Sequence, residues 1–468
     1  MARRVKLTGL AIALSTGLTG TAFAADLGGN CCADLEERIA ELEATTARKG
    51  NRKLSLEIYG QINEGILVWD DGVEQNAYLV TNDNARSRIG FRGKAKINSE
   101  WEAGYRLELG VRTINSKRFD QDTPRVSTDD NGLDLRDSYW YLKNKSLGTV
   151  YVGKGTTATN AITELNLSQT ANFSKYSDVE DSGLGLRLRG SVKNRLADSL
   201  TWRRLLGDGG DQPGEGERAL NVVRYETPAW AGFAASASWG EDDLWDAALR
   251  YTGEAAGFKY VAGIGYGEIT DNSQTQSVCP SAPTAPAGAD GSDTRCHQFG
   301  GSLSVIHEPT GLFVNVGAGT KTDDILTQTA RFAGTGADNT QDFWAIQAGI
   351  EKKFNELGKT TLYGEYYDYN GGANQRRTID GVDGGSQDAL NPFAAGGDGA
   401  IWSTGLNMYG AGIAQSIDAA SMILYVSYRH YEADLTARQI SGGVASGALA
   451  NVALENLDVV LGGGVIKF

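Results

Sequence analysis

The sequence predicts an all-β fold, a transmembrane antiparallel β-barrel of about 16–18 strands. Three observations lead to this prediction. Apolar and polar residues alternate with a period of two from residue 53 onward, the links between these segments are short and long in turn, and Tyr and Trp cluster near the segment ends. Such a sheet is an up-and-down meander, which closes into a barrel. Counting hairpins gives nine, hence about eighteen strands, with an error of one hairpin.

The first 24 residues have the three parts of a secretory signal peptide. Cations come first, a short apolar stretch broken by Thr, Ser and Gly follows, and Ala22-Phe23-Ala24 forms a small-x-small cleavage site. The apolar stretch is too short and too interrupted for a membrane-spanning helix. We therefore expect export and cleavage after Ala24, so that the mature chain begins near Ala25.

The composition excludes several classes of protein. The 468 residues have a formal charge of −14, and removing the three leader cations Arg3, Arg4 and Lys6 makes this −17. An acidic chain without a basic block argues against nucleic-acid binding. After the leader, no apolar run approaches the roughly 20 residues of a spanning helix. Mean hydropathy is −0.32, which by itself would indicate a soluble protein, but spanning strands escape such averages.

The alternation is clearest in residues 87–112, SRIGFRGKAKINSEWEAGYRLELGVR. One face carries Ile89, Phe91, Ala95 and Ile97, then Trp101, Ala103, Tyr105, Leu107, Leu109 and Val111. The other carries Arg86, Arg88, Arg92, Lys94 and Lys96, then Glu102, Arg106, Glu108 and Arg112. Short links include INSE, KNKSLG, KNRLAD and ETPAWAG, whereas long ones include residues 270–297, 369–400 and 433–454.

Periodicity alone does not separate a soluble sandwich or barrel from a membrane barrel, in which the apolar face meets lipid and the charged face lines the lumen. A closed soluble barrel of this size would need bulky apolar groups to fill its interior. Here the apolar face is rich in Ala, Gly and aromatic residues. Aromatics near segment ends would suit a membrane girdle or a sandwich core, and they include Tyr139-Trp140-Tyr141, Trp239, Trp245 and Tyr366-Tyr367-Tyr369.

Several stretches together resemble Gram-negative outer-membrane porins, most closely the alphaproteobacterial general diffusion porins. They are SRIGFRGKAKINSEWEAGYRLELG, LRDSYWYLKNKSLGTVYVGKGTTATNAI, NVVRYETPAWAGFAASASWGEDD and the final Phe468. The resemblance covers nearly the whole mature chain. It implies an outer-membrane, water-filled channel for passive diffusion of small hydrophilic solutes and ions, a homotrimer, contact with lipid and lipopolysaccharide, and a periplasmic N-terminal segment.

The resemblance also implies a role for the chain end. A terminal Phe with apolar residues two and four positions before it is the signal that the barrel-assembly machinery recognises in this family. Phe468 and Ile466 fit this pattern, whereas Gly464 departs from it. The last strand is then expected to close the barrel against the first.

The resemblance further implies that the third long loop, about residues 155–183, folds into the lumen as a constriction. Its acidic residues are Glu164, Asp178, Glu180 and Asp181, and the expected basic wall is Arg86, Arg88, Arg92, Arg106 and Arg136. Opposite charges across a narrow channel would create a transverse field. The alternative is that these charges are solvated loop and wall residues. The net charge favours cations at the mouth and the arginines favour anions in the throat, so the sequence leaves selectivity open.

Four cysteines suggest two different roles. Cys279 and Cys296 bracket PSAPTAPAGADGSDTR, which we expect to be a long external loop, and in an exported protein we expect a disulfide between them. Cys31 and Cys32 lie in the N-terminal segment 25–50, where Leu35, Ile39 and Leu42 form one short heptad seam. This short amphipathic helix could trimerise with cysteine cross-links, contact the cell wall through residues 31–49, or be a disordered tail.

No enzyme signature is present: HExxH, a Walker loop and GxSxG are all missing from the sequence. His297, His307 and His430 lack metal-site spacing, so we expect no metal and no cofactor. The expected layout is a signal peptide (1–24), an N-terminal segment (25–50) and a barrel (51–468). Two alternatives remain: a substrate-specific channel for sugars or carboxylates, with Tyr59 and Trp140 as inward aromatics, or a non-conducting barrel for envelope anchoring or adhesion.

Overall fold

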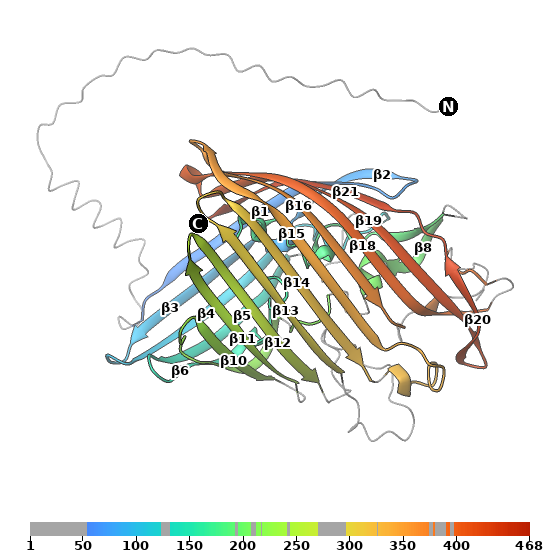
Figure 1. The fold of residues 1–468 in the computed structure, drawn as a ribbon, viewed down its shortest axis with the longest axis horizontal. Coiled ribbons are helices and arrows are strands. Elements are labelled where there is room, and N and C mark those ends of the chain that lie inside the picture. The colour runs from blue at the N-terminus through green and yellow to red at the C-terminus, as the bar shows by residue number, and fades with distance from the viewer. Residues whose placement is uncertain are drawn as a thin grey trace, which may run out of the picture. The chain divides into compact units, whose positions relative to one another are not determined.

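The computed structural model describes residues 54–122, 132–191, 195–206, 212–216, 218–240, 244–269, 296–324, 326–373, 378–379, 390–393 and 397–468. They belong to one compact unit, Leu54–Phe468 (Figure 1). The predictions for the signal peptide, the N-terminal helix, Cys31, Cys32 and Cys279 fall outside the described residues.

Within these residues, sixteen strands form a closed antiparallel barrel. In ring order they are β1 (Glu57–Asp70), β3 (Arg88–Lys96), β4 (Trp101–Arg112), β5 (Gly132–Asn144), β6 (Gly148–Thr156), β9 (Arg218–Glu226), β10 (Phe233–Gly240), β11 (Leu244–Ala255), β12 (Phe258–Ile269), β13 (Cys296–His307), β14 (Leu312–Asp323), β15 (Thr340–Asn355), β16 (Gly358–Gly371), β18 (Gly399–Ile417), β19 (Met422–Ser441) and β21 (Leu457–Lys467). The last strand pairs with the first, with Gln61 opposite Lys467 and Asp70 opposite Asp458. The prediction that the terminal strand closes the barrel is confirmed.

The remaining strands lie outside this ring of pairings. β2 (Gln75–Thr81) extends a hairpin from β1, β20 (Val444–Val452) extends one from β19, and β17 (Thr378–Ile379) pairs with the start of β18. β7 (Arg187–Gly190) and β8 (Arg195–Thr201) form a separate two-stranded sheet. The helical turns are short 3-10 helices: η1 (Asp83–Ala85), η2 (Gln169–Asn172), η3 (Val179–Asp181), η4 (Trp202–Leu206), η5 (Leu326–Gln328) and η6 (Asp418–Ala420). In the described part of the chain, no helix is long and apolar enough to cross a membrane.

The separate β7–β8 sheet explains why the count of eighteen strands is one hairpin too high, although sixteen lies within the expected range. The sequence around KNRLAD alternates like a barrel hairpin. Its apolar side chains, however, are fully buried against a protein core and do not face lipid: Leu184, Leu186, Leu188 and Ala197 are each 0% exposed. Alternation reports that one face is apolar, and either lipid or a core can cover that face.

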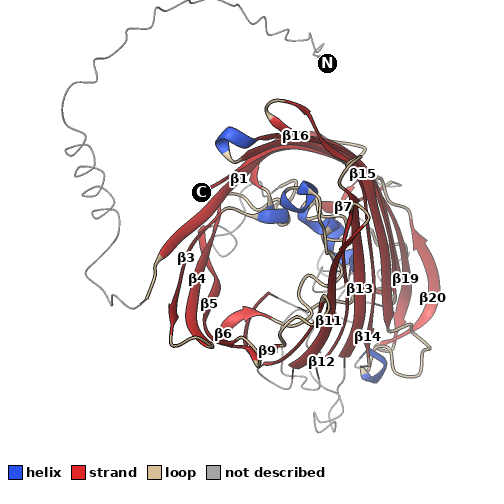
Figure 2. Ribbon diagram, turned by 60° about the vertical axis from the view of Figure 1, so that its left-hand side comes forward, coloured by secondary structure: helices blue, strands red, loops and turns tan. Residues whose placement is uncertain are grey.

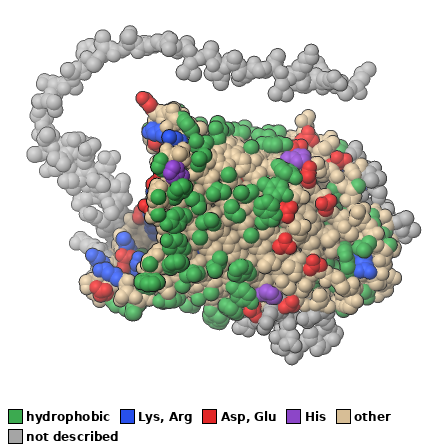
Figure 3. All heavy atoms as spheres, viewed as in Figure 1, with side chains coloured by type: hydrophobic (Ala, Val, Ile, Leu, Met, Phe, Trp, Pro, Cys, Tyr) green, Lys and Arg blue, Asp and Glu red, His purple; other side chains and the backbone are tan. Residues whose placement is uncertain are grey.

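The outer face of the barrel is apolar, as predicted. Large aliphatic side chains on alternate positions remain exposed, among them Ile62, Ile66, Leu249, Ile264, Leu362 and Ile413. Hydrophobic side chains gather over much of this wall in Figure 3. Because a lipid-facing side chain gains from an apolar surrounding, this exposure is favourable in a bilayer and would be costly in water.

The interior contains a large apolar core that the sequence analysis did not expect. Inward side chains of β16, β18, β19 and β21 pack against the connection between β6 and β9. The wall contributes Tyr363, Tyr367, Leu406, Met408, Tyr431, Leu457, Val459 and Leu461. The connection contributes Phe173, Tyr176, Val179, Leu184, Leu186, Leu188, Trp202, Leu205 and Leu206. One side of the interior is therefore filled by protein.

Candidate functional site

The β6–β9 connection is longer than the predicted constriction loop of residues 155–183. β6 ends at Thr156 and β9 begins at Arg218. Gly155 and Thr156 thus belong to the barrel wall, and residues beyond 183 belong to the same connection. Figure 2 shows short helices drawn within the ring of strands.

Inward polar side chains of the wall hold the backbone of this connection. In β11, the Asp246 carboxylate accepts hydrogen bonds from the amides of Ala158 (3.0 Å) and Thr159 (2.7 Å). Further along, wall oxygens accept from alternate amides: Leu165 N–H to Ser302 Oγ (3.0 Å), Leu167 N–H to Ser304 Oγ (2.9 Å) and Gln169 N–H to Glu351 Oε2 (2.6 Å). These bonds satisfy backbone groups that an irregular segment would otherwise leave unpaired. The first part of the connection, residues 158–169, is therefore fixed to β11, β13 and β15.

Inward glycines of β13 and β14 allow the connection to lie directly against the wall. A Cβ atom at Gly317 would lie 2.2 Å from the carbonyl oxygen of Thr163, and one at Gly319 would lie 2.2 Å from that of Pro213. A Cβ at Gly300 would lie 2.3 Å from the carbonyl oxygen of Gly214. Only glycine permits such close backbone approach. Sequence reasoning missed these positions, although the glycine pairs in FGGSLSV and VGAGT were their signal.

The five predicted arginines do lie on one wall, but carboxylates of the same wall pair with them. Glu108 on β4 is fully buried and contacts Arg106 (2.6 Å), Arg136 (2.8 Å) and Arg88 (3.9 Å). The two remaining arginines pair at the ends: Arg86 with Asp134 (2.9 Å), and Arg92 with Glu57. The basic wall is therefore a mixed ion-pair network with Glu108 at its centre.

The predicted acidic residues of the connection pair with lysines, whereas we expected them to stand opposite the arginines of the wall. Lys175 contacts Glu164 (2.7 Å) and Asp178 (2.5 Å). Lys117, in the loop after β4, contacts Glu180 (3.0 Å) and Asp181 (3.4 Å). All four acids are nearly covered, with side chains 2–11% exposed. The negative charges of these four acids are therefore neutralised mainly by the nearby Lys175 and Lys117 rather than by the arginines of the wall.

Burial changes the ionisation of these acids. It raises the pKa of Glu164 well above its usual value and that of Asp181 to about 6. It also raises the pKa of Glu215, which neighbours Asp178, to about 8. For Asp178, burial acts in the same direction, but Lys175 outweighs it and the pKa is lowered. The connection thus carries less negative charge at neutral pH than its composition indicates.

The two aromatics proposed to face the lumen are divided between the two faces. The Tyr59 hydroxyl donates to Glu108 (2.9 Å), so Tyr59 points inward as predicted. Trp140 is 53% exposed and pairs in register with Tyr105, while its neighbours Tyr139 and Tyr141 share the inward face. The prediction for Trp140 is wrong, because a run of three aromatics gives no indication of which positions face inward.

At the chain end, β1 and β21 are joined through Phe468. Its amide donates to the Gly60 carbonyl (3.1 Å) and its carbonyl accepts from the Gly60 amide (2.9 Å). The Phe468 ring is 62% exposed, and Ile466 pairs with Ile62 on the outer face.

The predicted disulfide involves Cys296, which begins β13, is buried and is disulfide-bonded. Its pairing with Cys279 stays a prediction.

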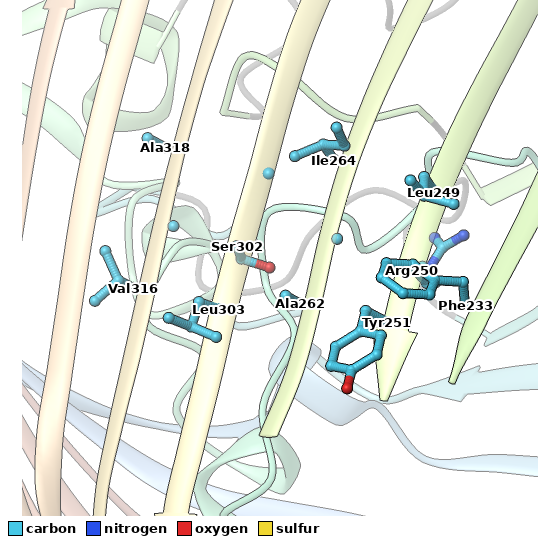
Figure 4. A pocket seen from close by; sticks show the side chains of 13 residues that line it. Phe233, Leu249, Arg250, Tyr251, Ala262, Ile264, Ser302, Leu303, Val316 and Ala318 are labelled. Atoms are coloured by element: carbon cyan, nitrogen blue, oxygen red, sulfur yellow. The ribbon is translucent and has the colours of Figure 1, made fainter. Parts of the chain in front are cut away.

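A shallow apolar groove crosses β10–β14 on the outer surface (Figure 4). Small side chains such as Ala262 and Ala318 stand there between Leu249, Ile264 and Leu303. Its large aliphatic side chains, Leu249, Ile264 and Leu303, are exposed on the outer face of the barrel.

A closed sixteen-strand barrel with an apolar outer face and a charged, partly filled interior defines a transmembrane channel of the porin type. The family model of the Gram-negative porin matches residues 9–448, and the chain belongs to that family. It is therefore an outer-membrane channel for passive diffusion and not an enzyme.

Solved structures with a similar fold include an anion-selective porin from Comamonas acidovorans, 14% identical, covering 89% of this chain and 100% of that one, with a TM-score of 0.49. In-vitro folded OmpT of Vibrio cholerae is 12% identical and covers 90% and 99%, with a TM-score of 0.46. OmpF of Salmonella typhi in complex with daunomycin is 13% identical and covers 89% and 98%, with a TM-score of 0.47. No curated protein sequence matches the chain.

Proposed function

We propose that the channel passes small hydrophilic solutes and ions between the β6–β9 connection and the wall formed by β3, β4 and β5. The observation that supports this most strongly is the contrast in exposure inside the barrel. Arg92 and Arg106 keep 53% and 32% of their side chains exposed, whereas the inward Tyr367 and Tyr431 on the opposite side are 0% exposed. Water and solutes would therefore follow the charged wall, and the connection would form the constriction.

We also propose a weak preference for anions at the constriction. Arg88, Arg92 and Arg106 are the more exposed charges, while the acids of the connection are covered and paired with lysines. Exposed charges around a water-filled path set its ion preference. The pore residues in this proposal are Arg86, Arg88, Arg92, Arg106 and Arg136 on the wall and Glu164, Asp178, Glu180 and Asp181 on the connection.

Single-channel recording of the detergent-folded protein in a planar bilayer under a salt gradient tests both proposals. We expect discrete openings, in steps of three if the protein is a homotrimer, and a reversal potential of the sign for anion preference. A reversal potential of the opposite sign would contradict the charge argument alone. A folded, heat-modifiable barrel without conductance would contradict the pore and favour an envelope-anchoring barrel.

Other predictions from the sequence remain proposals for this chain. They are a cleaved signal peptide (1–24), a periplasmic segment (25–50) that either trimerises or contacts the cell wall through residues 31–49, contact with lipopolysaccharide, a Cys279–Cys296 disulfide, and recognition of Phe468 and Ile466 by the barrel-assembly machinery. The exposure of Phe468 at the seam supports the last of these. Deleting Phe468 should lower the yield of heat-modifiable barrel in the outer membrane, and an unchanged yield would contradict this role.

A further inference from the structure

Tyrosine rings lie flat against the charged wall because glycines stand beside them on neighbouring strands. A Cβ atom at Gly90 of β3 would lie 2.3 Å from Cζ of Tyr59, and one at Gly104 of β4 would lie 2.3 Å from Cζ of Tyr141. Each ring therefore covers the position of a missing side chain, as aromatic residues do beside glycines in sheets. A ring in this orientation turns its other face toward the lumen.

Guanidinium groups accompany these rings. Those of Arg92 and Arg106 lie 4.9 Å and 5.4 Å from the ring centroid of Tyr59, and that of Arg224 lies 4.4 Å from the centroid of Tyr151. These distances are within the range of cation–π contacts. The same groups remain able to donate hydrogen bonds in the plane of the guanidinium.

The rings and guanidinium groups lie in a band on the inward face of adjacent strands. In register, Arg92 of β3 is opposite Arg106 of β4, Tyr141 of β5 is opposite Tyr151 of β6, and Tyr151 is opposite Arg224 of β9. The rings of Tyr141 and Tyr151 are 5.9 Å apart. We call this band the tyrosine–arginine surface: Tyr59, Arg92, Arg106, Tyr141, Tyr151 and Arg224.

The charge around this surface is accessible and slightly positive. Arg92, Lys94 and Arg106 have side chains 53%, 66% and 32% exposed, while Glu108 is fully covered. The acids that keep some exposure are Glu57, which pairs with Arg92, Glu102, which lies 4.0 Å from Lys94, and Glu226 of β9, which acts on Tyr151. Arg224 adds a fourth cation on this side. Exposed ion pairs are weak, so Arg92 can exchange Glu57 for the carboxylate of a solute at little cost.

We propose that the tyrosine–arginine surface binds small aromatic carboxylates as they pass through the channel. The ring of such a solute stacks on a tyrosine face, and its carboxylate pairs with a guanidinium group. A sugar would use the ring faces but would gain nothing from the excess of cations. The proposal rests on the proposed diffusion function and names the solute class that the charged wall retards and concentrates.

Benzoate block of single-channel current tests this inference. We expect a saturable reduction of conductance by benzoate, with a dissociation constant about threefold to tenfold lower than for cyclohexanecarboxylate, which has the charge without the aromatic face. Equal block by the two acids, or block by maltotriose in place of benzoate, would overturn the proposal.

Two variants locate the effect. Arg92→Gln should weaken benzoate block about tenfold, because a charge-assisted hydrogen bond is lost, and Tyr151→Leu should remove the preference over cyclohexanecarboxylate. Tyr409→Leu is the matched control, since Tyr409 lies exposed on the outer face, and block should not change. If both site variants retain wild-type block, the surface is not the binding site.

Calorimetric titration of the detergent-folded protein with benzoate separates this inference from the proposed function. Binding that is lost in Arg92→Gln supports the surface even if no current is measured. Conductance without any benzoate binding would overturn the inference and leave the diffusion pore intact.

Discussion

The inner faces of β16, β18, β19 and β21 and those of β3, β4 and β5 arise from the same two-residue alternation, yet they differ in chemistry. The first group is lined by buried apolar and tyrosine side chains that pack on the β6–β9 connection. The second carries half-exposed arginines and lysines around Glu108. Inward-facing residues of this barrel therefore differ with their surroundings: on one side they pack against protein, and on the other their charged groups stay partly exposed.

The largest effect is expected from removing Trp202, which is buried in the apolar core of the packed side. Trp202→Ala should lower the free energy that keeps the connection packed on the wall by about 3–5 kcal/mol, because a large cavity is left. The ring of strands does not depend on this residue, so the connection should loosen while the barrel stays folded. Limited proteolysis should then cleave the connection, and unheated gel mobility should remain that of a folded barrel. Resistance to protease would show that the core does not hold the connection.

A smaller effect is expected from Gly317→Val, which forces a side chain against the carbonyl oxygen of Thr163 at 2.2 Å. Overpacking of this kind costs about 1–3 kcal/mol. The connection should move off β14 toward the charged wall, and single-channel conductance should fall. Gly364→Val is the matched control, because the nearest atom to a Cβ there is 3.8 Å away. Equal conductance changes in both variants would contradict a specific contact.

On the charged side, Glu108→Gln removes the carboxylate shared by Arg88, Arg106 and Arg136. The interaction energy between a unit charge and an ion about 4 Å away in water is about 1 kcal/mol. Because Glu108→Gln removes one negative charge, the ratio of anion to cation permeability should rise about fivefold. The reversal potential in a salt gradient measures this change. A shift toward cations would mean that the arginines do not face the path.

The smallest effect concerns pH and Glu215, whose pKa burial raises to about 8. In the folded connection Glu215 keeps its proton up to about pH 8, whereas in the unfolded chain it releases the proton above about pH 4.5. The stability of the folded connection should therefore fall as pH rises from about 4.5 to 8. Of the groups around this carboxyl, Asp178 raises its pKa further, whereas the hydrogen bonds from Thr163 and the charge of Lys175 lower it. Glu215 keeps some exposure to solvent, which limits the loss of stability when it ionises.

Protease sensitivity of the connection at pH 5 and pH 9 tests this dependence. It should be greater at pH 9, and Glu215→Gln should reduce the difference. Equal sensitivity at both pH values in the wild-type protein would show that ionisation of Glu215 does not loosen the connection.

The charged wall was largely predictable from the sequence, whereas the packed side was not. Residues 86–112 alternate without interruption, so Arg88, Arg92, Arg106 and Glu108 had to share a face. The hairpin of residues 187–201 alternates equally well, and nothing local distinguishes a strand of the ring from one packed inside it. Lys117 was missed as a partner of Glu180 because the two residues are 63 positions apart. Lys175 lies three positions before Asp178, so its pairing could have been expected from the sequence.

The alternation in the sequence determined which face of each strand is apolar, because a period of two assigns each residue to a face. The closing role of the last strand followed from the resemblance to porins. Only the tertiary structure decided which inward faces meet the connection and which meet the aqueous path. It also decided that Trp140 points outward. The pairing of β4 with β5 shifts by one residue between Glu108 and Leu109, and this bulge exchanges the inward and outward positions along β5. The physical reason is that side-chain alternation is local, whereas the occupant of the interior comes from a segment distant in sequence.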